Sequence, residues 1–249
     1  MTWSSLQVEE HDDRVLVRLN RPEAKNAIDR QMVDELHQVC ALLEQTPRIA
    51  LITGSGGNFA AGADIAQLRD RRRDDALAGI NSGIFDRVRR LPMPVIGLLD
   101  GYVLGGGAEL AYACDFRIGT PDVRIGNPEP GLGILAAAGA SWRLVELVGE
   151  PVAKEILLAG RVLKADEAQQ LHLLTEVVDA DGLLEAGNAL ADRIAAQGAL
   201  AIRLSKAVFH APREAHPFID DLAQAVLFET EEKHDRMTAF LERKNRSSS

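Results

Sequence analysis

Apolar residues in the first half of the 249-residue chain form short runs that alternate with helical patterns. The short runs, each mainly apolar, are residues 15–19, 49–53, 95–99 and 116–119. A fully apolar run is typical of a strand that is covered on both faces of a sheet. Between the runs, residues 29–43 and 80–91 carry apolar side chains at intervals of three and four, which predicts helices. The alternation predicts an α/β fold whose loops gather at one edge of the sheet.

After Ser141 the pattern becomes almost entirely helical. The predicted helices are residues 142–148, 152–159, 165–171, 181–195, 199–209 and 217–241. No linker separates the two halves, so we expect a core domain over residues 1–195 and a helical C-terminal portion over residues 196–249. The charge run from Arg69 to Arg73 is interpreted as the solvated face of a helix.

Composition narrows the possible partners. The chain is 46% hydrophobic and 26% charged, which is ordinary for a globular protein, and its net charge of -9 disfavours broad binding to nucleic acid or anionic lipid. Cys40 and Cys114 lie in apolar stretches and are predicted to be buried thiols. The N-terminus lacks a secretory signal, and no apolar run reaches the roughly 18–20 residues that span a bilayer. We therefore expect a cytoplasmic protein without a membrane partner.

Three loops rich in glycine and alanine carry the candidate chemistry, and they cover residues 59–65, 100–110 and 126–133. Such loops leave backbone N–H groups uncovered, and the first two lead into predicted helices, whose N-termini carry partial positive charge. Two N–H donors aimed at one point form an oxyanion hole, although the same geometry also suits phosphate.

Other functional classes find little support in the motifs. Gly105-Gly106-Gly107 is followed by Ala108-Glu109 rather than by the Lys-Ser/Thr pair of a P-loop. The pattern Gly131-x-Gly133-x-x-Ala136 matches a loosened dinucleotide fingerprint, but prolines precede it and the residue 20 positions on, Pro151, is not the ribose-binding acid. The chain has no Gly-x-Ser-x-Gly elbow, and its histidines and cysteines lack metal-ligand spacing.

Two glutamates adjoin these loops. Glu109 lies in the opening turn of an otherwise apolar helix, where a carboxylate is costly unless it is solvated, paired or protonated. Glu129 lies between Pro128 and Pro130, which restrict its direction. Each could singly be a helix-end charge or a surface acid, but their occurrence together beside glycine-rich loops favours an acid/base pair.

The order of the motifs resembles the crotonase (enoyl-CoA hydratase/isomerase) family over nearly the whole chain. The segments that carry the resemblance are residues 20–27, Ala60-Ala61-Gly62-Ala63-Asp64-Ile65, Gly101 to Leu110 with Cys114-Asp115, Gly126-x-Pro128-Glu129, residues 157–178 and residues 228–243. The resemblance implies a crotonase-like fold, with a repeated ββα spiral core and a helical C-terminal portion that mediates trimerisation.

The resemblance also implies roles for individual residues. The backbone N–H groups of Ala63 and Gly106 would hold the thioester oxygen of an acyl-CoA substrate. Ala61, Asp64 and Ile65 would line the coenzyme A path, and Lys25 would contact the nucleotide phosphates, although an exposed turn lysine is an equally good interpretation.

Glutamates at both matching positions favour an enoyl-CoA hydratase. Glu109 would activate water for attack on the β-carbon, and a protonated Glu129 would deliver a proton to the α-carbon. Isomerisation of the double bond is the nearest alternative, and a non-catalytic acyl-CoA-binding protein is the second. The resemblance implies no metal or prosthetic group, because coenzyme A enters as part of the substrate, and it implies a homotrimer or a hexamer built as a dimer of trimers.

The chain departs from the family pattern at four places. These are the stretch Ala136–Ser141, Trp142, Pro130 after the second glutamate, and Asp235-Arg236 in the last helix. They are expected near the acyl pocket or the subunit contacts.

Overall fold

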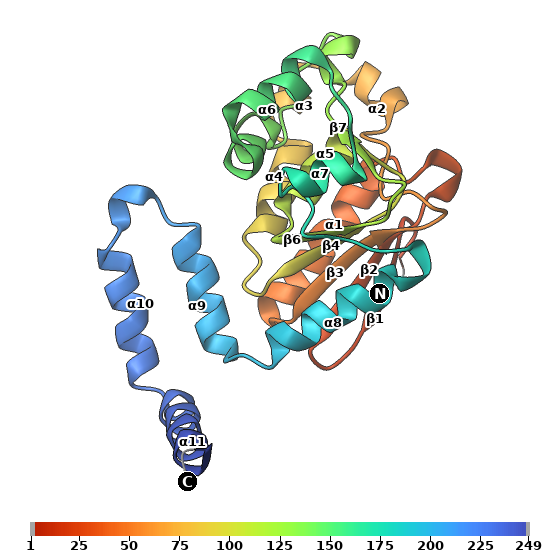
Figure 1. Ribbon diagram of the computed structural model, residues 1–249. Helices are drawn as coiled ribbons and strands as arrows, with labels where there is room; N and C mark the ends of the chain where they lie inside the picture. Colours follow the sequence, from red (N-terminus) through yellow and green to blue (C-terminus); the bar gives the residue numbers. More distant parts are fainter. Residues whose placement is uncertain (1–2, 248–249) are drawn as a thin grey trace. The chain divides into compact units, whose positions relative to one another are not determined.

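The computed structural model describes residues 3–247 and contains, within them, a mainly parallel six-stranded sheet (Figure 1). The strand order is β1-β2-β3-β4-β6-β9. The strands are β1 (Leu6–Glu10), β2 (Arg14–Leu19), β3 (Ile49–Gly54), β4 (Val95–Leu99), β6 (Phe116–Gly119) and β9 (Glu176–Val177). Among the described residues of this sheet, β1 runs antiparallel to β2, and the other neighbouring strands are parallel. The four strands predicted from apolar runs are confirmed, and β3 and β4 are almost fully buried, as fully apolar strands should be.

A second, smaller sheet lies in the same unit of the chain. It consists of β5 (Tyr102–Leu104), β7 (Arg124–Gly126) and β8 (Leu163–Lys164), with β5 and β7 parallel. These strands are two or three residues long, too short to produce a periodic pattern, and the sequence therefore did not predict them.

Helices surround the larger sheet. They are α1 (Arg30–Gln45), α2 (Ile65–Asp70), α3 (Arg73–Leu77), α4 (Ile80–Arg89), α5 (Gly106–Ala113), α6 (Val145–Ala159), α7 (Ala165–Gln170) and α8 (Leu183–Ala195). Asp29 is the N-cap of α1, because its Oδ1 accepts a hydrogen bond from the backbone N–H of Met32 at 2.8 Å. A turn of π-helix, Ala140–Leu144, leads into α6, and Gly149 interrupts α6 with φ 78° and ψ 160° between the two helices predicted there.

Helix α5 lies at the centre of the core. Each of its residues is buried, and it contacts α4 and β5. Cys114, which follows it, and Cys40 on α1 are buried thiols, as predicted. Gly107 lets the helix approach the first glycine-rich loop, since a Cβ there would lie 2.2 Å from the carbonyl oxygen of Ala60. The α/β fold with a helical C-terminal part is thus confirmed.

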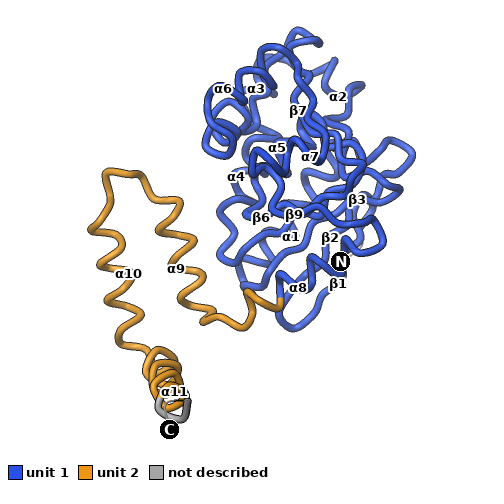
Figure 2. The backbone as a smooth tube through the Cα atoms, in the orientation of Figure 1, with its two compact units in different colours: residues 1–191 blue, residues 192–249 orange. Residues whose placement is uncertain are grey.

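The chain forms two compact units, residues 1–191 and 192–249 (Figure 2). The second contains α9 (Ala199–Phe209), α10 (Phe218–Phe228) and α11 (Glu231–Ser247). The prediction of one helix over residues 217–241 is wrong. The helix is interrupted at Glu229-Thr230. The hydroxyl of Thr230 accepts a hydrogen bond from the N–H of Lys233 and so begins a new helix.

The interpretation of the charge run at Arg69–Arg73 as one solvated helix face is also wrong. Helix α2 ends at Asp70 and α3 begins at Arg73, so the run crosses a break. Arg71 lies in this break and is half-buried, whereas Arg69 is exposed. Within residues 3–247, no helix combines the length and apolar character needed to cross a membrane.

Candidate active site

A cavity of about 440 Å³ opens in the unit formed by residues 1–191. Its walls come from the two glycine-rich loops that lead into α2 and α5, from the break between α2 and α3, and from the segment after β7. The lining includes Ala61, Ala63, Ile65, Arg71, Asn81, Gly106, Glu109, Glu129 and a group of apolar residues that comprises Leu68, Ile80, Leu132, Ile134 and Leu135. The cavity is therefore lined by most of the site residues that were predicted from the sequence.

Glu109 projects from α5 and is only 5% exposed. Its Oε1 accepts the backbone N–H of Ala138 at 2.7 Å and that of Ala140 at 3.2 Å. Burial raises the pKa of Glu109 to about 7, the two N–H donors oppose the rise, and the charge of Glu129 adds to it. The donors lie in the stretch 136–141 that departs from the family pattern, so this stretch positions the carboxylate.

Glu129 begins a turn of 3₁₀-helix, Glu129–Leu132, and is 8% exposed. Its Oε1 accepts a long hydrogen bond, 3.4 Å, from the side-chain amide of Asn127. Its buried Oε2 has no hydrogen-bond partner among the residues that the structure describes. Burial raises the pKa of Glu129 above its usual range, opposed by its own backbone N–H and by Asn127. A buried oxygen without a partner favours the protonated acid, or a ligand that supplies the missing contact.

Asn127 belongs to a buried network that the sequence did not reveal. The hydroxyl of Tyr112, on α5, donates to Oδ1 of Asn127 at 3.0 Å, and Nδ2 of Asn127 then faces Glu129 and the carbonyl oxygen of Gly105. Tyr112 and Asn127 are both fully buried. The one signal was a hydroxyl in an otherwise apolar helix, which needs a polar partner when it is buried.

Two backbone N–H groups face the same region from different loops. Those of Ala63 and Gly106 donate to no acceptor among residues 3–247. A Cβ built on Gly106 would lie 3.4 Å from the nitrogen of Ala63, so the two segments adjoin closely. Gly105, the N-cap of α5, has φ 52°, and a Cβ there would lie 3.1 Å from Oε1 of Glu129. Glycine is required at this position for both reasons.

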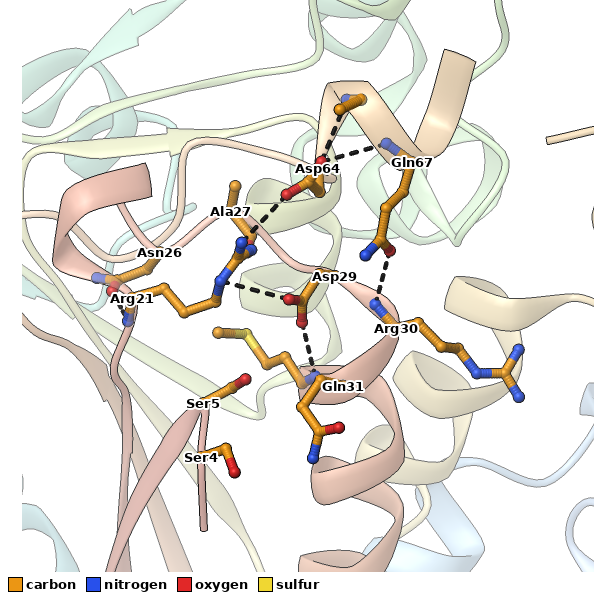
Figure 3. A network of polar contacts seen from close by, with 12 residues as sticks. Ser4, Ser5, Arg21, Asn26, Ala27, Asp29, Arg30, Gln31, Asp64 and Gln67 are labelled. Carbon is orange, nitrogen blue, oxygen red and sulfur yellow. Dashed lines mark hydrogen bonds and ion pairs between the residues drawn. The ribbon is translucent and has the colours of Figure 1, made fainter. Parts of the chain in front are cut away.

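A polar network fixes the loop that carries Ala63 (Figure 3). Arg21 forms ion pairs with Asp29 at 3.3 Å and with Asp64 at 3.2 Å, and Oδ1 of Asp64 caps α2 by accepting the N–H of Ala66 and Gln67. Ile28 and Ala63 pair as an isolated bridge. Residues 21–29 thus fix the backbone at Ala63 through the ion pair to Asp64 and the bridge from Ile28.

The predicted coenzyme-binding residues divide into two groups. Ala61 and Ile65 line the cavity. Asp64 does not, because its carboxylate turns to Arg21 and its backbone N–H donates to Ile28. Lys25 is also outside the cavity, and its ammonium group lies 4.5 Å from the ring centre of Tyr102.

This arrangement defines a class of enzyme site: two buried carboxylates with raised pKa values beside uncovered amide donors at the loop ends of a mainly parallel sheet. Such a site can move protons at carbon atoms next to a carbonyl group whose oxygen the amides hold.

Comparison with known proteins identifies the family. Residues 10–247 match the family model described as enoyl-CoA hydratase/isomerase, and the chain belongs to this family. It is similar to the crotonyl-CoA hydratase of Syntrophomonas wolfei, with 35% identity over 98% of this chain and 97% of the relative. It is also similar to the short-chain-enoyl-CoA hydratase of Clostridium acetobutylicum, with 31% identity over 98% and 97%. The crystal structure of the enoyl-CoA hydratase from Bacillus anthracis superposes with a TM-score of 0.90 at 29% identity, over 96% of this chain and 97% of that one.

The predicted family, fold and class of enzyme are confirmed by these matches. The family implies an acyl-CoA thioester as substrate.

Proposed function

We propose that the protein hydrates the double bond of an enoyl-CoA thioester, with Glu109 and Glu129 as its acid/base pair. One observation carries this proposal: two buried carboxylates from separate segments line the same cavity as the unbonded N–H groups of Ala63 and Gly106. The relatives named above are hydratases, which agrees with this reaction.

The thioester oxygen accepts the N–H groups of Ala63 and Gly106, and negative charge gathers on it as the β-carbon is attacked. One such donor contributes about 3–4 kcal/mol to the transition state. Glu109, aimed by Ala138 and Ala140, removes a proton from water as the oxygen of that water bonds to the β-carbon. Glu129, protonated at the orphaned Oε2, gives its proton to the α-carbon. Burial is the main cause of the raised pKa of Glu109, and a protonated Glu129 removes the smaller contribution from repulsion between the two carboxylates.

The remaining expectations about the ligand and the assembly belong to the same proposal. Coenzyme A passes Ala61 and Ile65, with Asp64 fixing that loop, and Lys25 contacts its phosphates. The reaction needs no metal or prosthetic group. The C-terminal portion, residues 196–249, mediates a homotrimer or a hexamer, since α9 to α11 expose large apolar side chains, namely Phe209, Phe218, Leu222, Val226, Phe228, Met237, Phe240 and Leu241. A cytoplasmic location is part of this proposal.

Two substrates separate hydration from its alternatives. Crotonyl-CoA is followed by the loss of its enoyl absorbance, and the β,γ-unsaturated isomer, 3-butenoyl-CoA, is followed by the appearance of that absorbance. A hydratase consumes crotonyl-CoA and forms the 3-hydroxyacyl product. An isomerase converts only the second compound, and a binding protein binds both without turnover. Calorimetry measures the affinity of the Glu129→Gln variant for both thioesters. An affinity close to that of the wild type means that lost turnover does not come from lost binding.

A further inference from the structure

Arg71 lines the cavity that contains the two glutamates. It caps the C-terminal end of α2, and its half-buried guanidinium donates to Oδ1 of Asn81 at 3.0 Å. Asn81 lies in the first turn of α4 and also lines the cavity. The proposed hydration of a simple enoyl chain gives this arginine no task.

The neighbouring arginines are engaged differently. Arg69 and Arg73 are exposed, and each pairs with the acidic residue that follows it, Asp70 at 3.0 Å and Asp74 at 3.1 Å. Arg71 has no carboxylate partner among the residues that the structure describes. A guanidinium presents five donors in a planar fork that suits a carboxylate, and burial without an anion is unfavourable.

Asn81 places Arg71 close to the reacting end of the substrate. Arginine only donates, so it faces Oδ1 of the amide and leaves Nδ2 toward Gly106. Nδ2 lies 3.6 Å from the position of a Cβ built on Gly106, the same point that is 3.4 Å from the nitrogen of Ala63. One amide side chain therefore separates Arg71 from the proposed site of the thioester oxygen. The phosphates of coenzyme A are separated from the thioester by the whole pantetheine arm, whereas the acyl chain begins at it.

The other charges nearby leave this end of the cavity cationic. Arg72 also lines it, and so does the exposed Asp75, whose Oδ2 accepts the backbone N–H of Arg72 at the start of α3. Leu68 of α2 and Ile80 of α4 add apolar side chains to the lining, beside the polar Asn81 and Ser82. An acyl chain here meets a hydrocarbon surface that ends at a positive charge.

We propose that Arg71 binds a carboxylate at the far end of the acyl chain, so that the preferred substrates are coenzyme A monothioesters of unsaturated dicarboxylic acids. This inference rests on the proposed hydratase function and assigns its substrate class.

The test is a ratio of specificities. The value of kcat/KM is measured for trans-2-hexenedioyl-CoA, which ends in a carboxylate, and for trans-2-hexenoyl-CoA, which ends in a methyl group. The wild type favours the first about tenfold or more, and Arg71→Gln lowers the ratio by about tenfold or more, as expected for the loss of a charge-assisted hydrogen bond. Arg71→Lys keeps part of the preference. Arg69→Gln, a matched change on an exposed arginine, leaves the ratio at its wild-type value.

Three outcomes overturn the inference. The first is a wild type that prefers the methyl-ended ester, and the second is an unchanged ratio in Arg71→Gln. The third is an equal loss for both esters that disappears with pantetheine thioesters, which would assign Arg71 to the coenzyme phosphates. Affinities of the two esters for Glu129→Gln, measured by calorimetry, give the same ratio without turnover. A protein that hydrates hexenoyl-CoA without a preference refutes only this inference, whereas one that hydrates no enoyl-CoA refutes the proposed function.

Discussion

Glu109 and Glu129 face one cavity from two different supports. Glu109 projects from a fully buried helix, and two backbone N–H groups converge on one of its oxygens. Glu129 projects from a short 3₁₀ turn between prolines, with one long side-chain hydrogen bond and one oxygen that has no partner within the described chain. The first support gives one carboxyl oxygen two backbone donors, and the second leaves one carboxyl oxygen without a donor among the described residues.

The difference teaches how one residue type acquires opposite tasks. Burial raises both pKa values, so burial alone does not distinguish acid from base. The two carboxyl groups differ instead in their hydrogen bonds. Two backbone N–H groups favour the charged form of Glu109, although burial outweighs them and raises its pKa to about 7, whereas Oε2 of Glu129 has no donor within the described chain. The chain supplies the two N–H groups for Glu109 from the stretch 136–141, whose sequence departs from the family pattern.

Removing the proton donor should have the largest effect. In Glu129→Gln, we expect hydration of crotonyl-CoA to fall about 10³–10⁴-fold, because glutamine cannot supply the proton that Glu129 is proposed to give to the α-carbon. Exchange of the α-hydrogens of butyryl-CoA with deuterated water should fall by a similar factor. NMR measures the exchange and absorbance measures hydration. Exchange at the wild-type rate in this variant would show that Glu129 does not act at the α-carbon.

Removing the base should separate the two reactions. In Glu109→Gln, hydration should fall about 10²–10³-fold, since water is no longer activated. The α-hydrogen exchange of butyryl-CoA should fall less than about tenfold, because it uses Glu129 and the amide donors. The same NMR and absorbance assays apply, and equal losses in both reactions would mean that the two glutamates share one task.

The sequence predicted those parts of the site that local motifs reveal. Glu109 and Glu129 were predicted because isolated acids beside glycine-rich loops are visible in a single stretch of residues, whereas Ala63 and Gly106 were predicted from the family resemblance. The cavity contains all four. The supports could not be predicted in this way. Tyr112 and Asn127 meet through the fold, and the donors at positions 138 and 140 are backbone groups of alanine, whose side chain carries no chemical signal.

The same limit explains the errors in the fold. Apolar patterns located β3, β4 and helix α4 between them. The break between α10 and α11 was missed because the polar run 229–236 does not by itself show where one helix ends, while the capping hydroxyl of Thr230 decides where the new helix begins. The break at Arg71 was missed because a charge run looks alike on a helix and in a loop.

The pH dependence of the reaction should sharpen the assignment of the base. Glu109 must be ionised to accept a proton, and its pKa is raised to about 7. Because a raised pKa keeps the carboxyl protonated at lower pH, kcat/KM for crotonyl-CoA should fall below pH 7, approaching tenfold per pH unit. A profile from pH 5 to 9 checks this, and Glu109→Gln should lose the acidic limb. A limb that instead lies on the alkaline side would assign Glu109 as the acid.

The smallest effect should come from the hydroxyl of Tyr112, which reaches Glu129 only through Asn127. In Tyr112→Phe, Asn127 loses the bond that fixes its amide, and we expect kcat to fall about three- to tenfold with KM little changed, the loss of about one buried hydrogen bond. A double-mutant cycle separates positioning from damage to the core. If Tyr112 acts through Asn127, then Tyr112→Phe should have almost no further effect on kcat in an Asn127→Ala background. Two outcomes would make Tyr112 a packing residue and leave Glu129 positioned by its prolines alone. One is a decrease in kcat from Tyr112→Phe that is equal in both backgrounds, and the other is a decrease in kcat that parallels a decrease in melting temperature in both.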